Sequence, residues 1–230
     1  MENKYNCLVC GEEIVYSEQS EKLKCFYCKK EFSSNAKCKN GHFVCDSCHS
    51  LGAYEIIKKY CNETVSKNPL KIAIDLMKHP SIKMHGPEHH FLVPAVLTAA
   101  YYNTINKREN IKDKLEEVEK RAKNILGGFC GFYGNCGAAV GTGIFMSVIT
   151  GATPLSKKEW KMSNLMTSKS LLSISEFGGP RCCKRDTFLS IEEAVDFIEE
   201  NLNVTLEKQD VKCNFSNINK QCLKEECKFH

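Results

Sequence analysis

The stretch CKNGHFVCDSC, Cys38–Cys48, decides how the first part of this 230-residue chain folds. It carries a Cys/His pair followed directly by a C-x-x-C pair, and two more C-x-x-C pairs precede it. Each such pair sits on a tight turn that directs two donors at one metal ion, and two pairs complete a closed tetrahedral site. Four pairs therefore predict two zinc ions within residues 1–50. The predicted ligands are Cys7, Cys10, Cys25, Cys28, Cys38, His42, Cys45 and Cys48.

The sequence leaves open which pairs share an ion. Sequential pairing would make a zinc ribbon from the first two pairs, with residues 8–26 supplying a hairpin. The spacing Cys38-x3-His42-x2-Cys45-x2-Cys48 instead resembles the middle of a RING finger, in which adjacent pairs bind different ions. Only two residues separate His42 from Cys45, so a single ion held by both of these pairs would be wrapped very tightly. This favours the interleaved arrangement.

Charge and size suggest what this N-terminal module does. Residues 1–50 contain seven Lys and seven Asp or Glu, and seven thiolates outweigh two Zn²⁺, so the loaded module is negative. A negative module is a poor partner for nucleic acid, because phosphate binding requires a basic footprint. The module also has little apolar material and needs its metal for stability. We expect a structural role or the docking of a protein partner.

Cysteine usage and hydropathy bear on the compartment. The chain has 15 cysteines, an odd number that one chain cannot pair completely. No signal peptide is visible, and the longest apolar stretch, residues 91–102, is shorter than the about 20 residues that a bilayer requires. We expect a cytoplasmic protein with no membrane segment, whose reduced thiols serve metal binding or catalysis. Such thiol density is easiest to tolerate without oxygen, which favours an anaerobe.

Residues 51–230 read as a mainly α-helical second domain. Helical periodicity predicts helices over residues 51–63, 68–78, 87–101, 107–124 and 138–150. Asn68 is the expected N-cap of the second of these, and a kink is expected at Pro94. Capping boxes at Ser156 and Ser190 predict the starts of two more helices. One short strand is expected near residues 204–206.

The segment GGFCGFYGNCGAAVGTG, residues 127–143, is the most unusual part of this domain. Its glycines would let the backbone approach a ligand closely, or they would serve only close helix packing. Cys136 is expected at a helix start, where the dipole and free amides favour a thiolate. Together with Cys130 it makes this segment a candidate site. It is not a phosphate-binding loop, because no Gly-Lys-Ser/Thr follows.

Two further segments carry candidate residues. In GGPRCCKR, residues 178–185, Cys182 and Cys183 lie beside three cations, which should lower their thiol pKa values. In HGPEHH, residues 85–90, His85 and His89 would either approach a metal or substrate or hydrogen-bond the start of the helix. A small third metal site with no familiar spacing could form from Cys213, Cys222, Cys227 and His230.

Two resemblances accompany these motifs. GFYGNCGAAVG, residues 131–141, is similar to the glycine–CGA–G core of small redox-active, metal-binding cysteine proteins of anaerobes. In that family a cysteine opens the preceding apolar helix, where this chain has His89 and His90. The longer stretch from His85 to Asn201 looks like an uncharacterised domain family of archaea and anaerobic bacteria, some members of which carry a methyltransferase domain. The resemblance supports a domain boundary and implies no reaction.

The leading functional hypothesis is a redox or sulfur-handling protein. Cys130, Cys136, Cys182 and Cys183 would converge on one accessible site near His85 and His89, and would hold an iron–sulfur cluster or another thiophilic metal. The second hypothesis is a group-transfer enzyme without a cluster, in which Cys136 is the nucleophile and His89 the base. The third is a non-catalytic adaptor that docks a partner through the zinc module.

Overall fold

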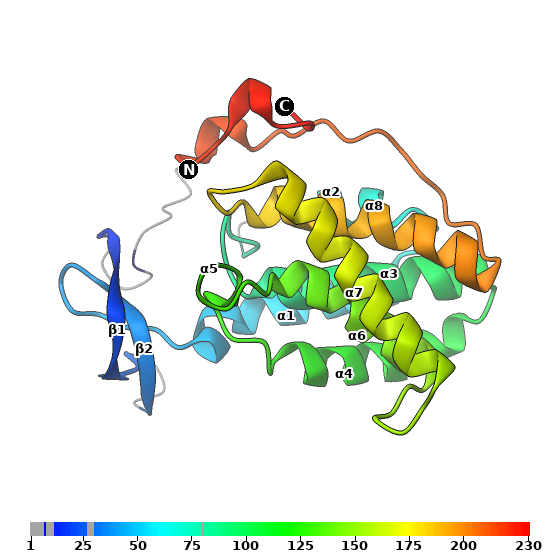
Figure 1. Cartoon of the computed structure of the whole chain (residues 1–230), viewed down its shortest axis with the longest axis horizontal. Helices are drawn as coiled ribbons and strands as arrows, with labels where there is room; N and C mark the ends of the chain where they lie inside the picture. The colour runs from blue at the N-terminus through cyan, green and yellow to red at the C-terminus, as the bar shows by residue number, and fades with distance from the viewer. Residues whose placement is uncertain (1–6, 8–11, 27–29, 80) are drawn as a thin grey trace.

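The computed structural model in Figure 1 joins a small hairpin to a bundle of helices. The structure describes residues 7, 12–26, 30–79 and 81–230, without the side chains of residues 47–51. This confirms a mainly α-helical fold with a small N-terminal cysteine module. The strands are β1 (Ile14–Lys24) and β2 (Glu31–Cys38), which pair antiparallel. The helices are α1 (Asp46–Glu63), α2 (Pro69–Met77), α3 (Glu88–Thr104), α4 (Ile111–Ala122), α5 (Phe129–Phe132), α6 (Gly137–Thr150), α7 (Lys158–Phe177) and α8 (Cys183–Leu202), with 3₁₀ turns η1 (Arg108–Asn110), η2 (Ser216–Ile218) and η3 (Lys224–Glu226).

Helix α3 is the centre of the bundle. Fourteen of its 17 residues are buried, as expected of a helix that is apolar on all sides. It packs against α1, α2, α4, α6 and α8. Phe91 of α3 stacks on Tyr54 of α1, with ring centroids 4.8 Å apart. Pro94 lies inside α3, and the kink expected there stays a prediction.

Glycines let α6 pack closely against both of its neighbouring helices. A Cβ atom at Gly141 would stand 2.8 Å from Cδ of Pro94 and 3.1 Å from the backbone oxygen of His90, both in α3. A Cβ atom at Gly143 would stand 2.9 Å from the backbone oxygen of Ser163 in α7. At these two positions the glycine-rich segment therefore serves helix packing.

Substitution of Gly141 with alanine should destabilise the bundle by about 1–3 kcal/mol, because the added methyl group overpacks the α3–α6 contact. Gly52 in the exposed surface of α1 is the matched control, since a Cβ atom there meets nothing within 4 Å. Gly52→Ala should stabilise the protein by roughly 0.5–1 kcal/mol through helix propensity. Urea unfolding of both variants measures the two effects, and equal signs would contradict the packing argument.

The observed helix caps differ from two of the predicted ones. Asn68 caps α2 as predicted and accepts a hydrogen bond from the Lys71 amide at 3.0 Å. Helix α7 runs over Lys158–Phe177, close to the helix predicted from Ser156, but Ser156 does not cap it, because this hydroxyl accepts from the Thr153 amide. The capping box at Ser190 is also wrong. Helix α8 begins at Cys183, so Ser190 lies within it, fully buried, and its hydroxyl has no partner among the described residues.

Helix α1 begins at Asp46, five residues before the predicted start, so it crosses the predicted boundary at residue 50. Only residues 39–45, which carry predicted ligands, lie between β2 and α1. Two polar contacts also fix the module to the bundle. The Asp46 carboxylate accepts a hydrogen bond from the Gly127 amide at 2.7 Å, and Arg181 donates to the Tyr16 hydroxyl at 2.8 Å.

After α8 the chain forms a tail, residues 203–230, that returns along the bundle towards the first turn of α8 (Figure 1). The strand predicted near residues 204–206 is not formed in this described segment, although Leu206 is buried. Phe229 is also buried and contacts Phe188 of α8, with ring centroids 5.3 Å apart. Among the described residues, no helix combines the length and apolarity needed to cross a bilayer.

Candidate metal centres

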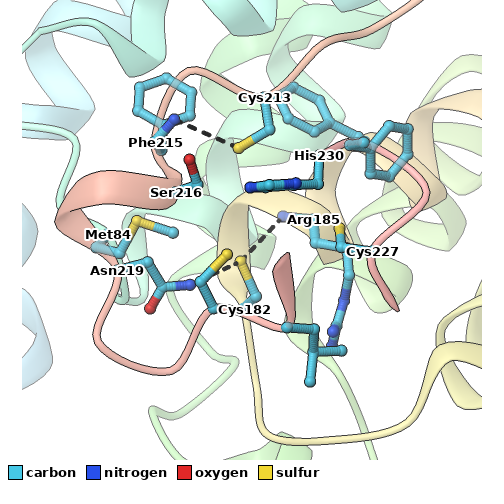
Figure 2. A pocket seen from close by; sticks show the side chains of 13 residues that line it. Met84, Cys182, Arg185, Cys213, Phe215, Ser216, Asn219, Cys227 and His230 are labelled. Atoms are coloured by element: carbon cyan, nitrogen blue, oxygen red, sulfur yellow. Dashed lines mark hydrogen bonds between the residues drawn. The ribbon is translucent and has the colours of Figure 1, made fainter. Parts of the chain in front are cut away.

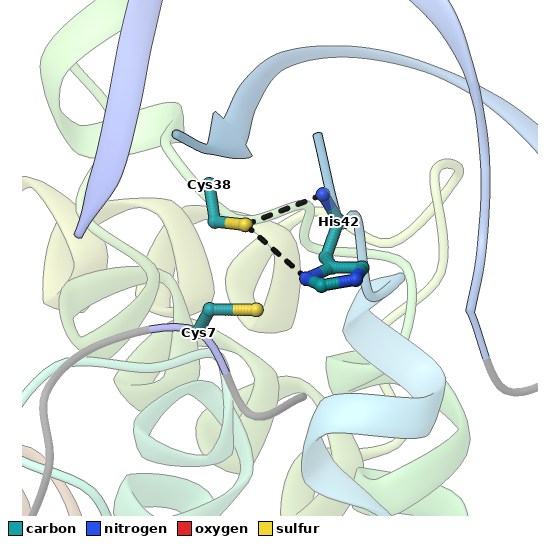
Figure 3. A group of neighbouring side chains, drawn as sticks. All are labelled: Cys7, Cys38 and His42. Carbon is teal, nitrogen blue, oxygen red and sulfur yellow. Dashed lines mark hydrogen bonds between the residues drawn. The ribbon is translucent and has the colours of Figure 1, made fainter. Parts of the chain in front are cut away.

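The first candidate centre lies in the N-terminal module. The ligand atoms of Cys7, Cys38 and His42 all lie within 4.8 Å of one another, and Figure 3 shows the two sulfurs and the imidazole facing a common point. Cys38 ends strand β2, and a turn through Gly41, whose φ is +80°, brings His42 back beside it. The Cys38 sulfur lies 3.5 Å from Nδ1 of His42 and accepts a hydrogen bond from the His42 amide at 3.2 Å. Thiolate and imidazole are the donors of structural zinc sites.

A second pair of ligands meets nearby. Cys25 and Cys45 are both buried, and the Cys45 amide donates to the Cys25 sulfur at 3.4 Å. The first cysteine of each of the first two pairs makes an equivalent backbone hydrogen bond. The Cys7 amide bonds the Glu12 carbonyl, and the Cys25 amide bonds the Lys30 carbonyl five residues on, at 2.7 and 2.9 Å.

These neighbours bear on the pairing of ligands. Cys7 lies with the third pair and Cys25 with the fourth, which is the neighbour pattern that interleaved pairing requires. Sequential pairing would instead bring Cys7 to Cys25. Three of the predicted ligands fall outside the described part of the chain: Cys10, Cys28 and the side chain of Cys48.

The second candidate centre is a pocket at the first turn of α8, which we call the four-cysteine pocket. Four cysteines line it: Cys182, Cys213, Cys222 and Cys227 (Figure 2). Each is half-buried. The cavity between the lining residues is small, about 20 Å³. The remaining lining residues are Met84, Arg185, Phe188, Phe215, Ser216, Asn219, Leu223, Phe229 and His230.

The tail and α8 together place these sulfurs. Cys182 is the N-cap of α8, and its sulfur accepts from the Arg185 amide at 3.5 Å. Cys213 is held to the end of the tail, because its amide donates to the Phe229 carbonyl at 2.6 Å. Cys227 closes the turn η3. The packing of Phe229 on Phe188 thus brings the tail cysteines to Cys182.

Hydrogen bonds from nitrogen reach three of the four sulfurs. The amide of Phe215 donates to Cys213 at 3.4 Å, and the amide of Lys224 donates to Cys222 at 3.3 Å. The side-chain amide of Asn219 donates to Cys182 at 3.6 Å, in addition to the Arg185 amide. Hydrogen bonds of this kind stabilise thiolates and tune the metals that they bind.

Cys130, Cys136 and Cys183 form a separate group, which we call the inner thiols. Cys136 is the N-cap of α6, and its sulfur lies 4.0 Å from Oδ2 of Asp186. Cys183 and Cys130 each lie close enough to Cys136 and Arg181 to interact with them electrostatically. Asp186 forms a buried ion pair with Arg185 at 3.2 Å, and Arg185 also lines the four-cysteine pocket. The two groups of thiols are thus neighbours across the first turn of α8.

The sequence hypothesis of one site for four cysteines needs correction. Of the predicted set, Cys182 faces the four-cysteine pocket, whereas the other three cysteines do not line it. Consecutive residues at a helix start point in different directions, so Cys182 and Cys183 enter different surroundings. Sequence analysis singled out the three tail cysteines only as a small site of their own with His230, because nothing in their spacing reveals that the tail returns to Cys182.

The expected thiol activation is also wrong. Burial raises the pKa of the Cys136 thiol to about 12, with the Asp186 charge as a second cause. Burial likewise raises the pKa of Cys182 to about 11 and that of Cys183 well above its ordinary value. Desolvation of a thiolate outweighs the helix dipole and the neighbouring cations here. These residues are protonated at neutral pH unless a metal displaces the proton.

The two predicted histidines hold structural positions. His89 is 1% exposed, and its ring nitrogens lie 3.0 Å from the Thr187 hydroxyl and 3.0 Å from the Lys83 carbonyl. Both nitrogens are therefore engaged, which agrees with the hydrogen-bonding alternative. His85 is half-buried and bonds the side chain of Gln221 at 3.2 Å. Burial lowers the pKa of His85 to about 4, so its ring is neutral and holds the tail next to Cys222.

Alkylation should reveal the raised pKa of Cys136. With a pKa of about 12, Cys136 has roughly a thousandfold less thiolate at pH 8 than an ordinary cysteine. Its reaction with iodoacetamide in the folded, metal-free protein should therefore be slow and should rise about tenfold per pH unit up to the pKa. Mass spectrometry of the modified peptide measures this rate, and the urea-unfolded chain is the control. Equal rates in the two states would contradict the assignment.

A Cys/His hairpin and a sulfur-rich end of a helical bundle define a cysteine-rich, mainly α-helical protein with candidate metal ligands in two places. The chain belongs to DUF5714, a family of unknown function, which matches residues 57–230. No curated protein and no solved structure matches the chain. We call residues 57–230 the family domain.

Proposed function

We propose that this protein handles electrons or sulfur in the cytoplasm, and that its family domain binds a thiophilic metal through cysteines. One observation carries the proposal. The family domain has eight cysteines, and all except Cys61 gather around the first turn of α8, as the four-cysteine pocket and the inner thiols. Soft thiolates select soft metals such as iron in clusters, copper and zinc. A gathering of seven such donors fits metal-linked sulfur chemistry better than packing alone.

We further propose that the N-terminal module is folded by two zinc ions. Cys7, Cys38 and His42 supply three donors to one ion, and Cys25 and Cys45 supply two to the other. The three cysteines outside the described side chains would complete two closed tetrahedral sites. A closed site leaves no position for substrate, so these ions act in folding.

The group-transfer alternative fits the geometry less well. A nucleophilic cysteine needs a depressed pKa or an adjacent base. Burial raises the pKa of Cys136, and His89 uses both ring nitrogens in other contacts. A raised thiol pKa does not oppose metal binding, because the metal ion replaces the proton.

Docking of a protein partner by the module is a second proposed role. Val15, Tyr16, Phe26 and Phe32 of the hairpin region are 36–52% exposed. Apolar side chains exposed together on one small module are typical of an interaction site. Replacement of Phe32 with serine should weaken capture of the partner from a native extract without loss of zinc. Capture that is unchanged in this variant would count against docking through the hairpin.

Anaerobic purification of the full chain tests the metal proposal. We expect zinc from the module and, in addition, a thiophilic metal that remains bound when both module sites are disabled by Cys38→Ser and Cys25→Ser. Elemental analysis and the number of titratable thiols measure this. If all bound metal disappears in that double variant, the family domain binds none and the proposal fails.

A further inference from the structure

We propose that the four-cysteine pocket is the binding site of a polynuclear iron–sulfur cluster, with Cys182, Cys213, Cys222 and Cys227 as its ligands. The inference rests on the proposed function and names its site and its cofactor. It replaces the ligand set expected from sequence, since it leaves Cys130, Cys136 and Cys183 outside the cluster.

The four cysteines of the pocket match the ligand set of a cluster. Four cysteines are the protein ligands of both common types of iron–sulfur cluster, and also of one class of zinc site. Here the four come from two segments that are distant in sequence, the start of α8 and the returning tail. Their thiols line one shared space, and none of them is bonded to another cysteine.

The spacing of the sulfurs separates a cluster from a single ion. Four thiolates on one tetrahedral ion, with metal–sulfur bonds of about 2.3 Å, lie about 3.8 Å apart. In the N-terminal module the described ligands already approach that compactness, within 4.8 Å. Among the residues that the structure describes, no three donors of the four-cysteine pocket are grouped so closely. The four sulfurs instead line the pocket at a wider spacing, which suits ligands distributed around a core of several atoms.

The lining suits a cluster in two further ways. Met84, Phe188, Phe215 and Phe229 provide apolar walls, and the three phenylalanines are at most 8% exposed. Cluster sites depend on such limited solvent access and on hydrogen bonds to sulfur. The amides of Arg185, Phe215 and Lys224 and the side chain of Asn219 supply four such bonds.

Charge at the pocket is also complementary. Four thiolates around an iron–sulfur core leave a net negative group, which needs nearby cations. Arg185 lines the pocket, where it is paired with Asp186, and the further cation Lys184 is buried beside it, with its ammonium 4.4 Å from the ring centroid of Phe215. The Lys184 ammonium donates to two backbone carbonyls, of Met77 and Ile82. His230 also lines the pocket but is a neighbour in this assignment, because four thiolates complete the ligand set.

The test compares ligand variants in the full chain. The protein is purified anaerobically and reconstituted with ferrous iron and sulfide, and iron and acid-labile sulfide are measured after gel filtration. We expect both in equal amounts, with visible absorbance near about 400 nm. Cys213→Ser, Cys222→Ser and Cys227→Ser should each lose at least roughly tenfold in iron affinity, because even residues behind a ligand matter by 10–100-fold. The matched controls Cys130→Ser and Cys136→Ser should retain iron and sulfide.

Other results would overturn the inference in recognisable ways. Zinc that is bound without sulfide and is lost on Cys222→Ser would show a single-ion site. The proposal of a bound thiophilic metal would then hold, and the proposal of a cluster would fail. Iron that is lost in the Cys130 or Cys136 variant and kept in the tail variants would refute the ligand set. A family domain that binds no metal would remove both proposals.

A variant that keeps every ligand guards against misfolding of the serine variants. Asn219→Ala removes one N–H···S bond to Cys182 and should leave the iron and sulfide content unchanged. The reduction potential of the cluster should fall, because hydrogen bonds to sulfur stabilise the more negative, reduced state. Voltammetry measures the shift. A potential equal to that of the unsubstituted protein would place the cluster away from Asn219 and contradict the assigned pocket.

Discussion

Replacement of Cys38 with alanine should unfold the N-terminal module while the helical bundle stays folded. Cys38 is 1% exposed and its sulfur contacts two atoms of His42, the ring Nδ1 and the backbone amide, so its loss removes a donor from the centre of the site. Structural zinc contributes about 10–16 kcal/mol of binding energy that is also folding energy. Among the described residues of the module, the cysteines are the only buried apolar side chains, so no apolar core could replace the metal.

Three measurements check this expectation. Zinc content should fall, limited trypsin should cleave within residues 12–45, and far-UV circular dichroism should retain the helical signal. Cys61→Ala is the matched control, because Cys61 is fully buried in α1 and contributes to the bundle core. That control should keep its zinc. A Cys38→Ala protein with full zinc and a protease-resistant hairpin would contradict a metal-folded module.

Substitution of Phe229 with alanine should have the second-largest effect, on stability and on metal content together. Phe229 is 2% exposed and packs edge-on against Phe188, and its carbonyl accepts the Cys213 amide. Loss of a buried phenylalanine ring costs about 3–5 kcal/mol. Because this ring anchors the tail, part of the loss should appear as release of residues 203–230 from the bundle.

The informative outcome is that iron retention falls although no sulfur has been removed. Phe132→Ala is the control, since Phe132 is 51% exposed and its removal should change stability by less than about 0.5 kcal/mol. Chemical denaturation, limited proteolysis of the tail and iron analysis give the three readouts. Full iron content in a Phe229→Ala protein with a released tail would exclude the tail cysteines as ligands.

Much of the fold follows from local signals in the sequence. Asn68 and Pro69 predict the start of α2 because capping chemistry is local, and the apolar run after Pro87 predicts the buried helix α3. The same local chemistry misleads at Ser190. A capping box acts only where the backbone amides are free, and at Ser190 the amides are already inside a helix that began at Cys183.

The two candidate sites likewise differ in how far local sequence predicts them. Cys38 and His42 are close in sequence and joined by one turn, so their spacing alone predicts that they meet. The four-cysteine pocket depends instead on the path of a tail with little regular structure. Its closure rests on contacts distant in sequence, such as Phe229 on Phe188 and Asn219 on Cys182, which no spacing rule encodes. The prediction of lowered thiol pKa values was wrong for a related reason. Neighbouring cations are visible in the sequence, whereas desolvation by burial is not.

Helix α1 connects the N-terminal module to the glycine-rich segment of the bundle. The residue just before its first turn is Cys45, a neighbour of Cys25. Its first residue, Asp46, accepts a hydrogen bond from the amide of Gly127 at the start of the glycine-rich segment. Because Asp46 lies in the first turn of α1, directly after the ligand Cys45, loss of order in the hairpin should weaken the hydrogen bond between Asp46 and the Gly127 amide. The Gly127 amide proton should therefore exchange faster with solvent when the hairpin loses its metal ions.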